Sequence, residues 1–497
     1  MMSPFACSLY FIISVTVFGA LVDVFLAGVA GGETPAFRLR KTPLYFALGA
    51  AVYTVPATLL SINGVKLSVM WFLALVVLAL ALNVCVYPST QALQGLRSPR
   101  LRSGQAGQAV PALLRGRGER PDAPLKPLKF WTGMSNIFVF AVIAAIAVLV
   151  AWKTAMKVAV PSFGIDLMAH LLIKAKILLH TTIKDSIFFH DPLFAHMHVK
   201  YPPMFAVFYN LLFLFMGGAF NGYYHVVNGF ILFLTGYAVY GFLAERIPRP
   251  QAALWFFIFV SAWYYVGSNL MEGSDLFLSL FFLVAAIELF RFIAGGRLYN
   301  LLTCAVTAAG GALMKNEGLM FAVFIFFILA ACRAFSPGGM RRAVREASLF
   351  LVVVAVMVLA WLVYRTGLPE AGLFHLKMIR EAGFVEYLPY LAATSSVFFG
   401  NLLSPIWSGV FILWAVMCIV FIRYCARSGA LVFALLALGQ LAVYFTIFWL
   451  TDGAVIRYNF SASGLTRVIS HCYPLALMTA ALITGERVWG RGREQRA

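Results

Sequence analysis

Residues 130–152 read FWTGMSNIFVFAVIAAIAVLVAW, and none of them is charged. A helix of about 20 apolar residues is long enough to cross the roughly 30 Å hydrocarbon core of a bilayer. Hydropathy predicts about fourteen such spans in the chain. We therefore expect an all-α polytopic membrane protein. The clearest of the other apolar runs are 5–28, 67–87, 252–270, 348–364 and 469–485.

Composition and charge agree with a membrane protein. The 497 residues are 62% hydrophobic and 11% charged, less than half of the roughly 25% that is usual in soluble domains. The net charge of +19 could suggest a nucleic-acid partner. However, the basic residues gather in 97–129, 333–345 and 487–496, where positive charge marks the cytoplasmic side of a membrane protein. We expect no nucleic-acid partner, and a bacterial inner (plasma) membrane as the location.

The chain divides into four parts at its polar stretches. Residues 88–129 carry Gly, Pro, Gln and many basic residues, a composition typical of a flexible cytoplasmic linker. This linker separates an N-terminal three-span module, 1–87, from a transmembrane core, 130–486. A basic cytoplasmic tail, 487–497, follows the core.

Two loops on the face opposite the basic linker have amphipathic stretches. Residues 166–183 and 370–392 place apolar and polar residues on different faces at helical spacing, as in helices that lie in the membrane interface. The basic linker and the basic tail should both be cytoplasmic, which requires an even number of crossings between them. The hydropathy windows predict an odd number. The runs 204–219 and 225–243 are the weakest, and one of them is expected to be re-entrant or to cross only halfway.

Asp166 opens the first of these loops, and ionisable residues at membrane depth are functional candidates. It is either a general base or a helix cap. The same loop holds five of the eight histidines, but no spacing of His, Cys or acidic residues matches a metal site, and the seven cysteines suggest no disulfide. We expect no metal ligands and no certain cofactor, with a divalent metal left open. The histidines of this loop are His170, His180, His190, His196 and His198.

Three further polar segments fall on the same face by alternation of the spans. The turns 272–275 and 315–317 each join two spans, and 451–471 is a basic loop with a single acid, Asp452. Such a loop suits a lipid phosphate, and ordinary interfacial anchoring is the alternative. The residues expected at the substrate cavity are His170, Asp191, Tyr201, Glu272, Asp275, Lys315 and Glu317.

The order of these segments resembles the GT-C superfamily of membrane glycosyltransferases, in the branch of protein mannosyltransferases and of lipid A and core glycosyltransferases. The resemblance covers roughly 130–486. It implies a bundle of about 13–14 transmembrane helices with interfacial helices in the outer loops. The segments that carry it are GIDLMAHLLIKAKIL, HVKYPPMFAVFYNLL, NLMEGSDLFLSLFFLVAAIELF, ALMKNEGLMFAVF and LTRVISHCYPLALM.

The resemblance also implies an activity and roles for single residues. A sugar on a polyprenyl-phosphate carrier would be transferred with inversion to a lipid, glycan or protein hydroxyl on the extracytoplasmic (periplasmic) side. Asp166 matches the acid that binds or deprotonates the acceptor. Arg467 matches a basic residue that serves the donor phosphate, and Arg457 and His471 are its neighbours.

The sequence departs from the family where many members have a second acid directly after the first. Leu167 stands at this position, which leaves Asp191 and Asp275 as substitutes. Two other functions stay open at this stage. One is a secondary transporter or lipid flippase, although the sequence has no visible internal repeat. The other is a polysaccharide ligase or polymerase, although these enzymes concentrate their chemistry in a late outer loop.

Overall fold

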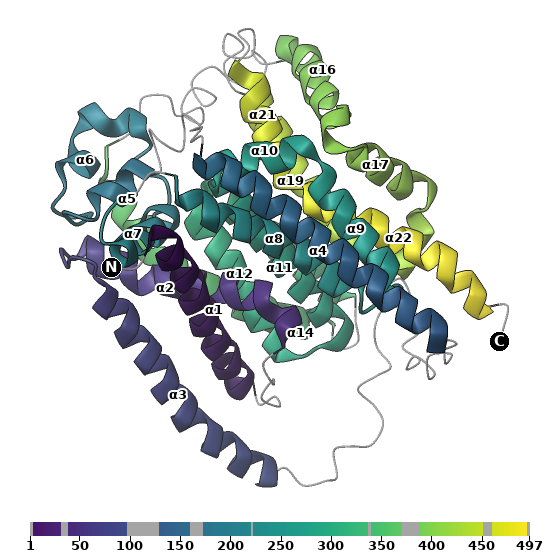
Figure 1. Cartoon of the computed structure of the whole chain (residues 1–497), viewed down its shortest axis with the longest axis horizontal. Coiled ribbons are helices and arrows are strands. Elements are labelled where there is room, and N and C mark those ends of the chain that lie inside the picture. The colour runs from purple at the N-terminus through teal and green to yellow at the C-terminus, as the bar shows by residue number, and fades with distance from the viewer. Residues whose placement is uncertain are drawn as a thin grey trace.

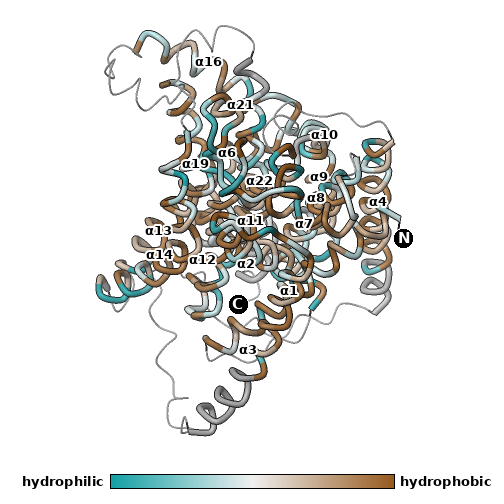
Figure 2. Tube along the Cα trace, turned by 90° about the vertical axis from the view of Figure 1, so that its left-hand side faces the viewer, coloured by the Kyte–Doolittle hydropathy of each residue, from teal (hydrophilic) through white to brown (hydrophobic). Residues whose placement is uncertain are grey.

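The computed structural model describes residues 3–30, 38–96, 129–159, 172–219, 222–335, 339–369, 388–450 and 460–494. Throughout these ranges the ordered elements are helices, and none is a strand. Hydrophobic residues line most of the helices along their length (Figure 2). The prediction of an all-α fold is confirmed for this part of the chain.

Eight of the described helices are long and apolar enough to cross a membrane, or up to eleven if each of three bent pairs is one span. Three shorter apolar segments, Val69–Val84, Met204–Met216 and Leu298–Met314, run alongside them. Figure 1 shows α4 across the front of the bundle and α3 at its edge, beside α1. The unbroken helices are α1 (Pro4–Val29), α2 (Thr42–Ile62), α3 (Val69–Leu96), α4 (Lys129–Ala159), α8 (Tyr224–Leu243), α11 (Ser274–Gly295), α12 (Leu298–Met314), α13 (Asn316–Ala334), α14 (Gly339–Tyr364) and α19 (Leu431–Trp449).

The three bent pairs break where the backbone leaves helical geometry. The bends are 61° between α9 and α10, 112° between the segments 388–407 and 410–420, and 44° between α21 and α22. Non-helical backbone at membrane depth is tolerated only inside the protein or beside a cavity. The elements of these pairs are α9 (Arg249–Ser261), α10 (Trp263–Glu272), α16 (Leu391–Leu402), η7 (Pro405–Trp407), α17 (Val410–Val420), α21 (Phe460–Ser470) and α22 (Tyr473–Glu494).

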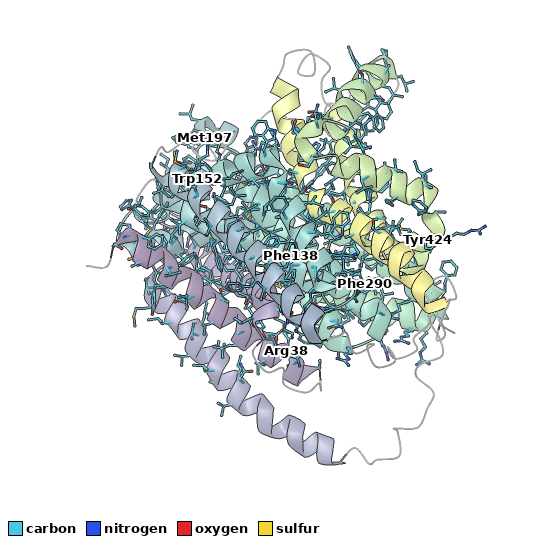
Figure 3. All side chains as sticks on the ribbon, turned by 45° about the vertical axis from the view of Figure 1, so that its right-hand side comes forward. Arg38, Phe138, Trp152, Met197, Phe290 and Tyr424 are labelled. Carbon is cyan, nitrogen blue, oxygen red and sulfur yellow. The ribbon has the colours of Figure 1, made fainter. Side chains whose placement is uncertain are left out.

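The bundle has two chemically different ends. At the basic end, Lys41 before α2 contacts Tyr299 of α12, and Arg291 of α11 pairs with Glu245 after α8. At the loop end lie the short elements of the first outer loop. Figure 3 labels Trp152 and Met197 toward the loop end and Arg38 toward the basic end. The short elements of the first outer loop are α5 (Ile173–Ile177), α6 (Ile187–His190) and η4 (Pro192–Met197).

Helix α7 (Met204–Met216) follows the first outer loop. It has only 13 residues, and it packs on α5. Tyr209 in its middle donates a hydrogen bond of 2.5 Å to Asn228, in the second turn of α8. Helix α8, in contrast, is long enough to cross. The short helix α7 fits the expectation that one of the runs 204–219 and 225–243 does not cross fully.

Helices α1 and α2 pack tightly on each other and on the helices that follow the linker. A Cβ on Gly19 would lie 1.6 Å from the Tyr45 carbonyl oxygen, and one on Gly49 would lie 2.1 Å from that of Val15. Small residues allow this close approach of two backbones in a membrane. Both helices also contact α7, α8 and α12. The N-terminal helices therefore share the hydrophobic core of the bundle.

Candidate functional site

Two turns between spans and the bend between α21 and α22 meet at the loop end and bring polar residues together. Gly273 separates α10 from α11 with φ +69°, and a Cβ there would lie 2.8 Å from the Asn228 amide. Only glycine fits both this conformation and this space. Lys315 is extended between α12 and α13, and His471 lies at the bend between α21 and α22. Side chains at these breaks point to one place although the chain segments are far apart in sequence.

Asp275, in the first turn of α11, is the centre of this loop-end cluster. Its Oδ1 accepts a hydrogen bond from Lys315 Nζ and lies 2.9 Å from His471 Nε2. Its Oδ2 accepts from Arg467 Nε at 2.9 Å. The side chains of Asp275, Lys315 and His471 are at most 7% exposed, and that of Arg467 is 16% exposed. Three basic groups therefore converge on one buried carboxylate.

Tyr444 of α19 fixes the orientation of the His471 ring. Its hydroxyl lies 2.6 Å from His471 Nδ1, on the side of the ring away from Asp275. A carboxylate can only accept, so His471 Nε2 carries the proton that faces Asp275. In the neutral imidazole Nδ1 then accepts from Tyr444, and in the charged form Nδ1 donates to it. The chain Tyr444, His471 and Asp275 links α19 to α11.

Glu317 lies beside this cluster, in the first turn of α13. Its Oε2 is buried and has no hydrogen-bond partner among the described residues. Its backbone oxygen accepts from Gln440 Nε2 at 3.4 Å, and the Gln440 side-chain oxygen is likewise buried without a partner in the described part of the chain. Buried polar atoms of this kind need an explanation, and a bound polar group is one.

The first outer loop holds a second buried cation. Lys174 of α5 is 4% exposed, and its Nζ donates to the His198 carbonyl oxygen at 2.5 Å. The same Nζ lies 5.9 Å from the centre of the Tyr201 ring, and His198 stacks on that ring. Burial lowers the pKa of Lys174 to about 7.

The helix expected over 166–183 differs from the observed one. Within the described residues it is helical only over Ile173–Ile177, and Lys174 faces the interior instead of water. The carbonyl of His198, at a residue with φ +52°, attracts the ammonium inward. Asp191 also lies in this loop, where its side chain accepts from Leu193 N at 2.9 Å and caps η4.

The structure brings together only part of the residues predicted from sequence. Asp275, Lys315, Arg467 and His471 are in direct contact, and Glu317 is close by. Asp191 and Tyr201 belong to the separate first outer loop. Asp166, His170, Arg457 and the 370–387 part of the second amphipathic segment lie outside the described residues, as does the side chain of Glu272. In the described ranges no three His, Cys, Asp or Glu side chains are grouped as metal ligands.

Sequence reasoning missed Tyr444 and Gln440 at the site. Both lie on α19, whose run LVFALLALGQLAVYFTIFW is otherwise almost wholly apolar. The signal was present, since Gln440 is the one amide in that run and it is fully buried. Tyr444 gave no such signal, because a tyrosine in a span is common at either interface.

The basic end has a buried charged group of its own. Asp23 of α1 accepts from Lys41 Nζ at 3.2 Å and from the Tyr299 hydroxyl, and Lys41 also donates to Tyr299 at 2.8 Å. Glu288 and Glu245 both pair with Arg291. Asp23 is the only acid in the apolar run 5–28, a signal that the sequence analysis did not use.

No family model, curated protein or solved structure matches this chain.

Proposed function

We propose that this chain is an inverting glycosyltransferase that moves a sugar from a polyprenyl-phosphate carrier to an acceptor hydroxyl. The loop-end cluster is the observation that carries the proposal. Lys315, Arg467 and His471 surround Asp275 at the end of the bundle opposite the arginine-rich end. Since positive residues mark the cytoplasmic side, the cluster faces the extracytoplasmic side.

The cluster has the chemistry to stabilise a phosphate that leaves. Lys315 and Arg467 place two basic groups against Asp275, with Glu317 close by, in a largely buried site. Preorganised cations in such a site stabilise negative charge as it develops in a transition state. Arg467 is also the residue that the family resemblance matches to the donor phosphate, with Arg457 and His471 as its neighbours, and the observed contacts place His471 and Lys315 on the same carboxylate as Arg467.

The reaction follows from these roles. The acceptor oxygen attacks the anomeric carbon from the face opposite the carrier, and a new carbon–oxygen bond forms. The bond from the anomeric carbon to the phosphate oxygen breaks, and its electron pair stays on the polyprenyl phosphate beside Lys315 and Arg467. The proton of the acceptor hydroxyl passes to the Asp166 carboxylate. One substitution at the anomeric carbon inverts its configuration.

The test uses the full chain in lipid nanodiscs with polyprenyl-phosphate sugars as donors. Mass spectrometry measures the sugar transferred and the free polyprenyl phosphate released. We expect transfer by the native chain and none above background by Asp166→Asn. Native-rate transfer by Asp166→Asn would show that another group is the base. Failure of the native chain with every donor, together with unchanged glycolipids and glycans in cells that lack the gene, would refute the glycosyltransferase proposal.

A transporter or flippase is the second candidate, because three spans are bent. Broken helices at membrane depth are typical of ion and substrate sites in secondary transporters. One of these breaks, the 44° bend between α21 and α22, lies at His471 in the cluster itself. Flux of labelled lipid across proteoliposomes, with no change in its covalent structure, would favour this function over sugar transfer.

A further inference from the structure

Helix α10 ends at a buried carbonyl group that its own backbone leaves without a donor. In a continued helix the Leu270 carbonyl oxygen would accept from the N–H of Ser274. The chain instead turns at Gly273, and among the described residues that backbone bond is not formed. Leu270 is 1% exposed, and a buried carbonyl group without a partner costs free energy. The end of α10 therefore needs a donor from another part of the chain.

Two side chains of α8 supply this donor. His225 Nδ1 lies 2.7 Å from the Leu270 oxygen, and Asn228 Nδ2 donates to the same oxygen at 3.1 Å. Since a carbonyl oxygen only accepts, the His225 ring carries a proton on Nδ1. His225 and Asn228 are both fully buried. They are three residues apart on α8, so they lie on one face of that helix and together cap α10.

Asn228 also holds the turn that follows α10. Its amide fills the space beside Gly273, where a Cβ would lie 2.8 Å from it. Its Oδ1 accepts from the Tyr209 hydroxyl of α7 at 2.5 Å, which directs its N–H toward Leu270. The short helix α7 therefore orients the residue of α8 that caps α10.

Packing alone does not account for a histidine at position 225. The Nε2 atom of His225 is buried and has no hydrogen-bond partner among the described residues. Half of the polar ring is thus unsatisfied, a cost that a leucine of similar size would avoid. What the histidine adds is the bond from Nδ1 to the end of α10.

The turn after α10 leads directly to the loop-end cluster. Asp275 lies two residues after Gly273, in the first turn of α11. Arg467 Nε and His471 Nε2 each lie 2.9 Å from one of its carboxylate oxygens. A shift of about 1 Å at a reacting site, even from a remote cause, can cost about a hundredfold in rate. The conformation of this turn therefore sets the geometry of the cluster.

We propose that His225, Asn228 and Tyr209 are positioning residues, which hold the turn between α10 and α11 and thereby keep Asp275 in the loop-end cluster. The inference rests on the proposed function, and it adds side chains that act on the reaction through Asp275 without touching the substrate. The family resemblance gives none of the three a role. The proposal also gives the short helix α7 a task in the site.

The first experiment measures kcat and the KM for the donor, per folded molecule, with the full chain in nanodiscs. His225→Leu and Asn228→Leu each remove a donor to the Leu270 oxygen. We expect kcat to fall about tenfold in both and KM to change less than about twofold, because the cluster acts mainly on charge that develops in the transition state. Tyr209→Phe removes one hydroxyl group and should lower kcat about threefold.

Two further variants separate positioning from general damage. Thr235→Val is the matched control, because Thr235 is fully buried on α8 and its hydroxyl donates to the Ile231 oxygen of the same helix. It should leave kcat and KM unchanged. His225→Asn is the conservative variant, since the amide of asparagine places an N–H close to the position of Nδ1. It should restore most of the kcat that His225→Leu loses.

The second arm observes Asp275 without any sugar transfer. Infrared difference spectra of protein with isotope-labelled aspartate, native against Asp275→Asn, identify the band of this carboxylate. Its frequency depends on the hydrogen bonds that the carboxylate accepts. We expect the band to shift in His225→Leu and Asn228→Leu, and to keep its native position in Thr235→Val and His225→Asn.

The outcomes separate this inference from the proposed function. A native kcat in both leucine variants would overturn the positioning role, and so would a lower kcat with an unchanged Asp275 band. A shifted band in a chain that transfers no sugar would retain the positioning role and refute the glycosyltransferase. If the leucine variants do not fold, the same two measurements on Tyr209→Phe decide, because this variant loses only a hydroxyl group.

Discussion

The loop-end cluster and the charged group at the basic end both bury carboxylates inside a membrane bundle, but they are built differently. Asp23 lies inside the continuous helix α1, near its basic end, and is satisfied by Lys41 and Tyr299. Asp275 directly follows the turn between α10 and α11 and is met by three basic groups, two of which, Lys315 and His471, also lie between helices. The cation of the basic end is 20% exposed, whereas Lys315 is 7% exposed.

This difference separates a structural pair from a candidate site. A one-to-one ion pair with a tyrosine on unbroken helices neutralises itself and joins α1 to α2 and α12. Several basic groups that meet at one buried carboxylate cost free energy that packing alone does not return, since each ion loses its hydration. Such an arrangement fits a site that receives an anion from outside the chain. The two regions should therefore respond differently to loss of their acid.

Asp275→Asn should have the largest effect. It removes the counter-charge of Lys315, Arg467 and His471, so we expect sugar transfer to fall at least about a hundredfold and the free energy of unfolding to fall by about 3–5 kcal/mol. Transfer is measured in nanodiscs, and stability by thermal unfolding in the same detergent for both proteins.

The double variant Asp275→Asn, Lys315→Met controls for misfolding. Removing one of the uncompensated cations should restore part of the melting temperature but none of the transfer. If the double variant regained both, the cluster would be only a structural ion pair, and the contrast between the two ends would disappear.

Asp23→Asn should reduce stability without changing the reaction. Lys41 and Tyr299 lose an ionised partner, and we expect a loss of about 2–3 kcal/mol, less than at Asp275 because Lys41 reaches water. The transfer rate per folded molecule should stay at the native value. The pair Asp23→Leu, Lys41→Met is the matched control and should recover most of the stability. A lower kcat in Asp23→Asn would mean that the basic end takes part in the reaction.

Much of the fold was predictable from sequence, because the bilayer requires long apolar helices and these are visible in hydropathy. The sequence pointed to the short helix α7 only indirectly, through an odd number of predicted crossings between the basic linker and the basic tail. The helix breaks were partly visible, since Gly273 and the polar turn at Lys315 interrupt apolar runs. The boundary at His471 was placed between the loop 451–471 and the apolar run 469–485, but the helix α21 within that loop was not predicted.

The site residues could be selected from the sequence, but the contacts between them could not. Asp275, Lys315, Arg467 and His471 could be selected one by one, since charged residues near spans are rare. That they contact each other depends on how α11, α12 and α21 pack, and the local sequence contains no information on this. For Lys174 the sequence-based prediction was wrong. Its helical spacing predicted a side chain that faces water, and the fold buries it.

Lys174 extends the comparison to a buried cation that has no described carboxylate partner. Its pKa in the folded chain is about 7, below its ordinary value of 10.5, because burial disfavours the charged form. Below pH 7 the folded and unfolded chains both carry the proton, and the full cost of the buried charge is present. Between pH 7 and 10.5 the unfolded chain binds more protons, so stability rises with pH as this cost is relieved.

Lys174→Met should therefore stabilise the protein at low pH and lose that advantage at high pH. At about pH 6 we expect a gain of about 2 kcal/mol, because the relieved desolvation exceeds the hydrogen bond lost at the His198 carbonyl. Thermal unfolding of native and variant proteins across the pH range measures the difference. Lys176→Met, on the same short helix but only partly buried, is the control and should show no such pH dependence. A constant difference between Lys174→Met and the native chain at every pH would show that Lys174 does not lose its proton in the folded protein, and that a further acidic group compensates it as Asp275 compensates Lys315.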